Sequence, residues 1–175
     1  MEFDNLTQKL YKENINWIYS IIKDLDAKGI ENKNKFTKDP YVLNNMIVLG
    51  YYFMNLYIVS NMDDIDKDKQ NDVMMAVING ASSYNQKELS RIYNKSLDLN
   101  RIVEDYNSIV RKTKLYAKED SNKARIIAID EVYRRIYDTV NKRHLMAFTR
   151  IFIASFKEYE ARIATTINRC LKEEK

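Results

Sequence analysis

A stretch of 22 residues without a charged side chain constrains this chain more than any other feature. It runs from Tyr41 to Met62 and reads YVLNNMIVLGYYFMNLYIVSNM, in a sequence where 31% of the residues are Asp, Glu, Lys or Arg. A helix that is apolar on almost all sides lies either inside a protein core or across a membrane. We expect it to be the central helix of a soluble fold, because its several Asn and Tyr side chains would be costly in lipid.

The scarcity of turn-forming residues favours the same architecture. The chain of 175 residues contains three Gly and one Pro, whereas average usage is about 7% and about 5%. Sandwiches and barrels need many such residues, and phosphate-binding loops need closely spaced glycines. We therefore predict an all-α fold, with one domain over residues 1–175 built as a bundle of five or six helices around the central apolar helix at 41–62.

Apolar side chains recur at three- and four-residue intervals along most of the remaining chain, which is typical of amphipathic helices. Such helices would pack their apolar stripes around the central helix, with long helices at the C-terminal end. A polar connection is expected at 31–38 and an acidic turn at 63–72. The predicted amphipathic helices span residues 4–28, 68–79, 86–117 and 121–172.

Several helix boundaries carry recognisable signals. Gly29 suits the left-handed position that ends a helix, and Asp39–Pro40 suits the cap and first residue of the central helix. We expect Gly80 to end the short helix that follows the acidic turn. Asn85 and Glu88, three residues apart, resemble a capping box and predict the start of the next long helix.

The last helical region, residues 121–172, has two apolar faces. At about 100° per residue, the apolar residues around Val132 centre on one direction, and those around Phe152 centre roughly 120° away. The change falls at Asn141–His144. We favour a break or kink there. The alternative is one long helix that packs on its own bundle and on a second subunit.

The acidic turn has a partial resemblance to a calcium-binding loop. Asp64, Asp66 and Asp68 stand at the first, third and fifth positions of an EF-hand pattern. That pattern needs Gly at its sixth position and Glu at its twelfth, whereas this sequence has Lys69 and Met75 there. We interpret the segment as a solvated helix connection and predict no metal site.

His144 and Cys170 are the single histidine and the single cysteine of the chain. A zinc site needs further ligands of these types, and the two residues are 26 positions apart, which in a helix separates them by about 39 Å. We therefore predict no catalytic residues and no cofactor, and expect His144 at the surface or at a helix junction. One cysteine and an N-terminus without a basic, then apolar, leader favour a cytoplasmic location.

An uncharged polar stripe runs along the otherwise apolar helix at 41–62. Asn44, Tyr51 and Asn55 form it, spaced seven and four residues apart, so they share one face. Two interpretations remain open. The stripe is a buried polar seam that fixes helix register, which we favour, or it lines a groove for a partner helix, in which case these residues are the candidate site.

Positive charge is concentrated in the C-terminal half. The net charge is +4, and residues 86–175 hold 20 basic against 13 acidic side chains. A basic ridge on a long helix can follow phosphates, but acidic residues are interspersed here and no aromatic stacking platform accompanies them. The candidate basic face consists of Arg134, Arg135, Lys142, Arg143, Arg150 and Lys157.

From these observations we expect a non-enzymatic interaction or regulatory protein that acts through its helix surfaces on a protein partner. Self-association into a homo-oligomer fits the two apolar faces of the last region. A nucleic-acid-associated protein that uses the basic face is the first alternative, and a membrane-active helical protein is the second. The richness in Ile, Asn, Lys and Tyr is typical of AT-rich genomes and fits a viral, phage or mobile-element origin.

Overall fold

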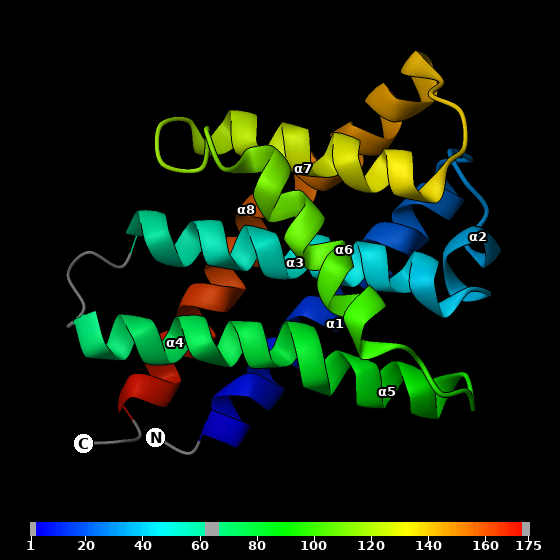
Figure 1. The fold of residues 1–175 in the computed structure, drawn as a ribbon. Helices are drawn as coiled ribbons and strands as arrows, with labels where there is room; N and C mark the ends of the chain where they lie inside the picture. The colour runs from blue at the N-terminus through cyan, green and yellow to red at the C-terminus, as the bar shows by residue number, and fades with distance from the viewer. Residues whose placement is uncertain (1–2, 62–66, 173–175) are drawn as a thin grey trace.

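The computed structural model describes residues 3–61 and 67–172, and these residues form helices and turns without a strand (Figure 1). The prediction of an all-α, single-domain bundle around a central helix is confirmed. The elements are α1 (Phe3–Ala27), α2 (Asn34–Thr37), α3 (Pro40–Asn61), α4 (Lys67–Asn79), the π-helical η1 (Gly80–Tyr84), α5 (Asn85–Ile92), α6 (Leu99–Thr113), α7 (Ser121–Ile136) and α8 (Lys142–Lys172).

The apolar helix α3 lies at the centre, and the other long helices pack around it (Figure 1). It begins as predicted: the Asp39 carboxylate accepts a hydrogen bond from the Tyr41 amide at 2.8 Å, and Pro40 is the first helical residue. By length and composition α3 could cross a membrane, but 78% of its most apolar stretch is buried inside the fold. Core packing therefore accounts for its apolar surface.

The end of α1 also follows the prediction. Gly29 has a φ of +64°, the left-handed conformation that glycine adopts at no steric cost. The Gly29 amide donates to the Asp26 carbonyl at 3.0 Å, and the Ile30 amide donates to the Leu25 carbonyl at 2.9 Å. Together these bonds form a Schellman motif, which satisfies carbonyl groups that the helix end would leave unpaired.

The connection at 31–38 is more structured than its polar composition indicates. It contains the single turn of α2, and Phe36 within that turn is completely buried. The Phe36 ring lies 6.4 Å from the ring of Phe148 on α8. One aromatic side chain therefore anchors an otherwise solvated loop onto the core. The polar composition of residues 31–38 as a whole gives no sign of this contact.

The prediction that Gly80 ends a helix is wrong. α4, η1 and α5 form one continuous rod below α3 in Figure 1, and Gly80 begins the π-helical turn in its middle. A Cβ atom added to Gly80 would lie 2.9 Å from the Tyr51 hydroxyl of α3. Glycine is present here because α3 approaches closely, and not because the helix stops.

The predicted capping box at Asn85 and the predicted helix at 86–117 are also wrong. Asn85 continues the rod with helical dihedral angles and is completely buried, and its side-chain amide donates a hydrogen bond to Asn44 of α3. The rod ends at Ile92, and the chain turns at Asn94, which has a φ of +47°. The Asp98 carboxylate then accepts from the Asn100 amide at 2.9 Å and starts α6. Asparagine tolerates the left-handed conformation, so Asn94 could turn the chain without a glycine.

The expected interruption of the last helical region is confirmed. α7 ends at Ile136 and α8 begins at Lys142, so the break falls slightly before the Asn141–His144 segment where the apolar face changes. The Asn141 side chain accepts a hydrogen bond from the His144 amide at 3.2 Å and so caps α8. α7 packs on α3 and α6, whereas α8 packs mainly along α1 and meets α7 over a short stretch.

Candidate functional site

The polar stripe of α3 lies within the helix packing. Asn44 and Tyr51 are both 0% exposed, and Asn55 is partly buried. Asn44 and Asn55 bond to other helices: Asn44 donates to Asp105 of α6 at 2.6 Å, and Asn55 donates to the Tyr106 hydroxyl. This placement corresponds to the buried polar seam, and no groove opens along Asn44 and Tyr51.

Asp105 of α6 is the charged centre of this seam. Its side chain is 3% exposed, and it accepts hydrogen bonds from Asn44 and from the guanidinium of Arg135 on α7. Arg135 also donates to the Asn45 side chain at 3.1 Å. A buried carboxylate needs such partners, because an unpaired charge in the interior is strongly destabilising.

The predicted basic face is thereby divided. Arg135 belongs to the seam, and Arg134 pairs with Asp130 one turn earlier on α7 at 2.7 Å. The remaining members are exposed, and among the residues that the structure describes none of them forms an ion pair. They are Lys142, Arg143, Arg150 and Lys157, all on α8.

An apolar groove lies beside these cations, between α7 and α8. It consists of two adjoining hollows with volumes of about 330 Å³ and 490 Å³. Ile126 of α7 lines both hollows, so they adjoin at this side chain. Ile129, Ile153 and Phe156 line the first hollow, and Leu145, Met146 and Thr149 line the second. We call this surface the α7/α8 groove.

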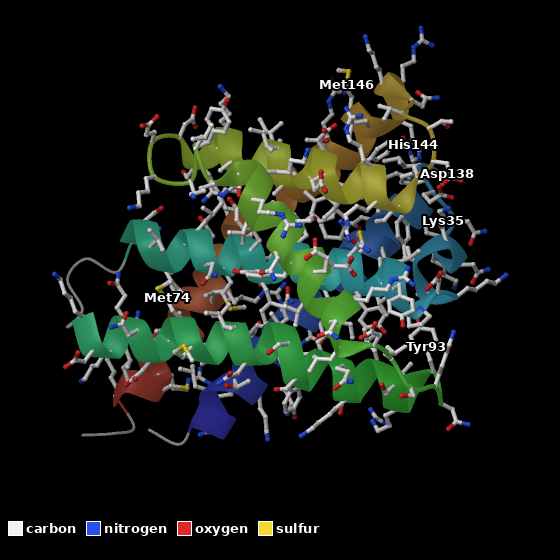
Figure 2. The ribbon with its side chains drawn as sticks, in the orientation of Figure 1. Lys35, Met74, Tyr93, Asp138, His144 and Met146 are labelled. Carbon is white, nitrogen blue, oxygen red and sulfur yellow. The ribbon has the colours of Figure 1, made fainter. Side chains whose placement is uncertain are left out.

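Three large apolar side chains of the groove remain open to solvent. Ile126 is 50% exposed, Met146 is 56% exposed and Ile153 is 51% exposed. Figure 2 shows Met146 at the outer edge of the molecule, near the start of α8. Burying a fully exposed side chain of this size stabilises by about 1.5–3 kcal/mol. Covering the exposed half of each of these three side chains would therefore stabilise a complex by roughly 1 kcal/mol.

The cations follow one edge of the groove. Arg143, Arg150 and Lys157 are spaced seven residues apart, and Arg150 and Lys157 line the second and first hollows respectively. Arg150 stands four residues after Met146, and Lys157 four residues after Ile153, so each lies about 40° round α8 from its apolar neighbour. The result is an apolar strip with a positive border.

A partly buried ion pair includes Arg125, which lines the first hollow. Arg125 of α7 binds Glu160 of α8 at 2.8 Å, with side chains 11% and 20% exposed, and the guanidinium lies 4.0 Å from the centre of the Phe156 ring. Burial raises the pKa of the Glu160 carboxyl and lowers the pKa of the Arg125 guanidinium. In both residues the effect of desolvation is larger than that of the partner charge, and the pair joins α7 to α8.

The chemically reactive residues lie elsewhere and apart. His144 sits at a helix junction, as predicted, where one ring nitrogen lies 2.9 Å from the Tyr133 hydroxyl and the other 2.9 Å from the Ile30 carbonyl. Cys170 is buried near the far end of the same helix. No cluster of potential metal ligands occurs within residues 3–61 and 67–172, and Asp64 and Asp66 lie outside those ranges.

Sequence reasoning identified the cations of α8 but missed the apolar strip that they border. The signal was present: Met146 and Ile153 repeat at the same seven-residue interval as the cations, away from the buried stripe through Phe148 and Phe152. On α7, Ile126 is exposed while its neighbour Ile129 is buried. Their association could not be foreseen without knowing how α7 and α8 pair.

Comparisons with protein-family models, with curated proteins and with solved structures found no match.

Proposed function

We propose that this protein is a non-enzymatic interaction protein that binds a partner protein through the α7/α8 groove. The observation that carries the proposal is the alignment of Ile126, Met146 and Ile153, each about half exposed, along two adjoining hollows. Isolated exposed apolar residues are ordinary, but an aligned apolar surface bordered by charge is typical of a protein-binding site.

The dimensions of the groove suit a helix from the partner. From Leu145 to Phe156, α8 rises about 16.5 Å, which equals about three helical turns. An amphipathic helix laid between α7 and α8 would present apolar residues at intervals of three, four and seven. Its side chains would occupy the two hollows on either side of Ile126.

Nucleic-acid binding is the second candidate, because four exposed cations of α8 have no ion-pair partner among the described residues. The neighbouring side chains favour the protein partner. Single-stranded nucleic acid binds by stacking on aromatic rings, whereas the exposed side chains beside the cations are aliphatic or thioether. Arg134 and Arg135 are also engaged in ion pairs, which shortens the basic face.

The membrane-active alternative would need α3 to leave the core. The most apolar stretch of α3 is largely buried, and Asn44 and Asn55 hold it to α6 by hydrogen bonds. Insertion would expose those amides to lipid at a high free-energy cost. We propose that the folded bundle acts in the cytoplasm, where the single buried thiol of Cys170 would stay reduced.

The proposal is tested by comparing two double variants in affinity purification from the native host. Met146→Glu/Ile153→Glu places charge in the groove, and Met75→Glu/Ile92→Glu makes the same change at side chains of similar exposure on α4 and α5. We expect the groove variant to lose a partner that wild type and the control variant retain. The partner is then identified and purified, and its Kd for the groove variant should be raised at least tenfold.

Equal binding of the purified partner by all three proteins would overturn the proposal. So would loss in the control variant alone. Circular dichroism and thermal unfolding establish that both variants are folded, which the exposed positions of all four residues favour.

A further inference from the structure

We infer that the occupant of the α7/α8 groove is an acidic amphipathic helix of a partner protein, an inference that rests on the binding role proposed above. The apolar strip defines one face of that helix. The unpaired charges beside the strip are positive. They therefore indicate negative residues beside the apolar face of the partner helix.

The acidic groups near the groove are already neutralised by neighbours. Asp130, on the α7 edge, binds Arg134 at 2.7 Å. Glu160 binds Arg125, which lines the first hollow, at 2.8 Å. Neither carboxylate is therefore available to balance the cations on the α8 edge.

The cationic groups of the α8 edge are not neutralised in this way. Arg143, Arg150 and Lys157 are exposed and form no ion pair with any residue that the structure describes. Glu158, the nearest acidic residue in sequence, interacts with Arg162 at 3.5 Å. At about 100° per residue it points roughly 100° further round α8 than Lys157 and away from the apolar strip. Arg150 and Lys157 thus place two unmatched positive charges on the border of the groove, and Arg143 continues their seven-residue spacing toward the start of α8.

The spacing of these charges specifies the partner pattern. Seven residues of α8 advance about 10.5 Å, the same distance that separates residues i and i+7 on a second helix. A helix lying along the groove can therefore place Asp or Glu opposite successive cations while its apolar residues enter the hollows. Charged border residues of this kind set partner choice and association rate more than they set total affinity.

The test is selection from a displayed library of helical peptides of about 18 residues, long enough to cover the three turns of the groove. The library has a fixed apolar stripe, and all flanking positions are randomised. Wild type and Arg143→Glu/Arg150→Glu/Lys157→Glu are used as separate baits. Lys12→Glu/Lys23→Glu/Lys87→Glu is the matched control, since it changes the net charge equally at exposed lysines of α1 and α5.

We expect wild type and the control to enrich peptides with Asp and Glu beside the apolar stripe, and the groove-edge variant to enrich Lys and Arg there. A selected acidic peptide should lose at least tenfold in affinity for the groove-edge variant at low salt. That difference should shrink at high salt, because the Debye length falls from about 10 Å at 0.1 M to about 3 Å at 1 M.

Other outcomes overturn the inference in distinguishable ways. Peptides that Met146→Glu/Ile153→Glu no longer binds, but whose flanks are neutral or basic, would overturn the acidic partner and leave the groove as a binding site. Peptides that the same variant still binds would overturn the proposed function as well.

Two further measurements decide between this occupant and other classes. A solution mass of two chains for wild type and of one chain for Met146→Glu/Ile153→Glu would make a second copy the occupant and overturn the inference. A single-stranded oligonucleotide that binds wild type, binds Met146→Glu/Ile153→Glu equally and is lost from the groove-edge variant would overturn it in favour of nucleic acid.

Discussion

Asp105 is the residue on which the polar seam depends. It joins α3, α6 and α7 through Asn44 and Arg135, with a side chain that is 3% exposed. Buried ionic groups of this type contribute little net stability relative to an apolar pair, but removal of one partner leaves the other charge uncompensated. The seam therefore fixes how these helices register against one another.

We predict that Asp105→Ala lowers the free energy of unfolding by about 3–5 kcal/mol, because the charge of Arg135 and the amide of Asn44 lose their acceptor. Urea denaturation followed by circular dichroism measures the change. Asp130→Ala is the control, since Asp130 pairs with Arg134 on the surface, where such a pair contributes about 0–1 kcal/mol. Similar losses for both variants would contradict the role assigned to Asp105.

Tyr51 provides a second prediction at the residue scale. Its hydroxyl is buried without a hydrogen-bond partner in the part of the chain that the structure describes, and it faces Gly80. A buried hydroxyl without a partner is destabilising. We expect Tyr51→Phe to leave the unfolding free energy unchanged or to raise it by up to about 1 kcal/mol, as measured by urea denaturation.

A double-mutant cycle links Tyr51 to the π-helical turn. Gly80→Ala alone should destabilise by about 1–3 kcal/mol, because the added methyl group would overpack against the Tyr51 ring and hydroxyl. In the Tyr51→Phe background the loss should be smaller, since the closest atom has been removed. Purely additive effects would show that the two residues do not compete for the same space.

At the scale of elements, helix ends were predictable where a local signal had one meaning. Gly29 and Asp39 acted as cap residues, and the two apolar faces of 121–172 indicated the break before α8. The predictions made from Gly80 and Asn85 were wrong because tertiary contacts determine the roles of these residues. Gly80 lies against Tyr51, and Asn85 binds Asn44. The sequence alone does not distinguish a glycine that permits close helix packing from a glycine that ends a helix.

The candidate site was predictable only in part, for the same reason. The heptad of cations on α8 was visible in the sequence, but the division of the basic face was not. Arg134 and Arg135 are adjacent, yet one pairs on the surface and the other reaches the buried Asp105. The packing of helices against one another decides which cations form ion pairs. Sequence periodicity alone does not predict that packing.

At the scale of the whole molecule, the core is unusually rich in tyrosine. Burial raises the pKa of Tyr93 and of Tyr106 to about 12, and it raises the pKa of Tyr51 and of Tyr159 well above the ordinary value. These side chains keep their protons in the folded state at a pH where the unfolded chain loses them. Their contribution to stability is complete below about pH 10 and is lost as the pH rises toward 12.

We therefore predict cooperative alkaline unfolding. Each well-buried tyrosine lowers stability by about 1.4 kcal/mol per pH unit above about pH 10, so Tyr51, Tyr106 and Tyr159 together remove about 4 kcal/mol per pH unit, a large share of the about 5–15 kcal/mol of an ordinary domain. Tyrosinate absorbance and far-ultraviolet circular dichroism should change together and abruptly. Gradual ionisation near pH 10 with the helices intact would contradict the burial of these side chains.

The α7/α8 groove is the feature of the whole molecule on which the proposed role rests. α8 follows α1 and separates from α7, and this divergence leaves Ile126, Met146 and Ile153 half exposed. A partner helix would complete the packing that these two helices begin.

Site-specific photo-crosslinking in the native host tests this claim most directly. A benzophenone amino acid replaces Ile153 in the groove or, as the control, Ile92 on α5, which has nearly the same exposure. We predict that the groove position yields one dominant adduct with a second protein, identified by mass spectrometry, which disappears when Met146→Glu is added. Adducts formed equally from both positions, or unchanged by Met146→Glu, would contradict the groove as the binding site.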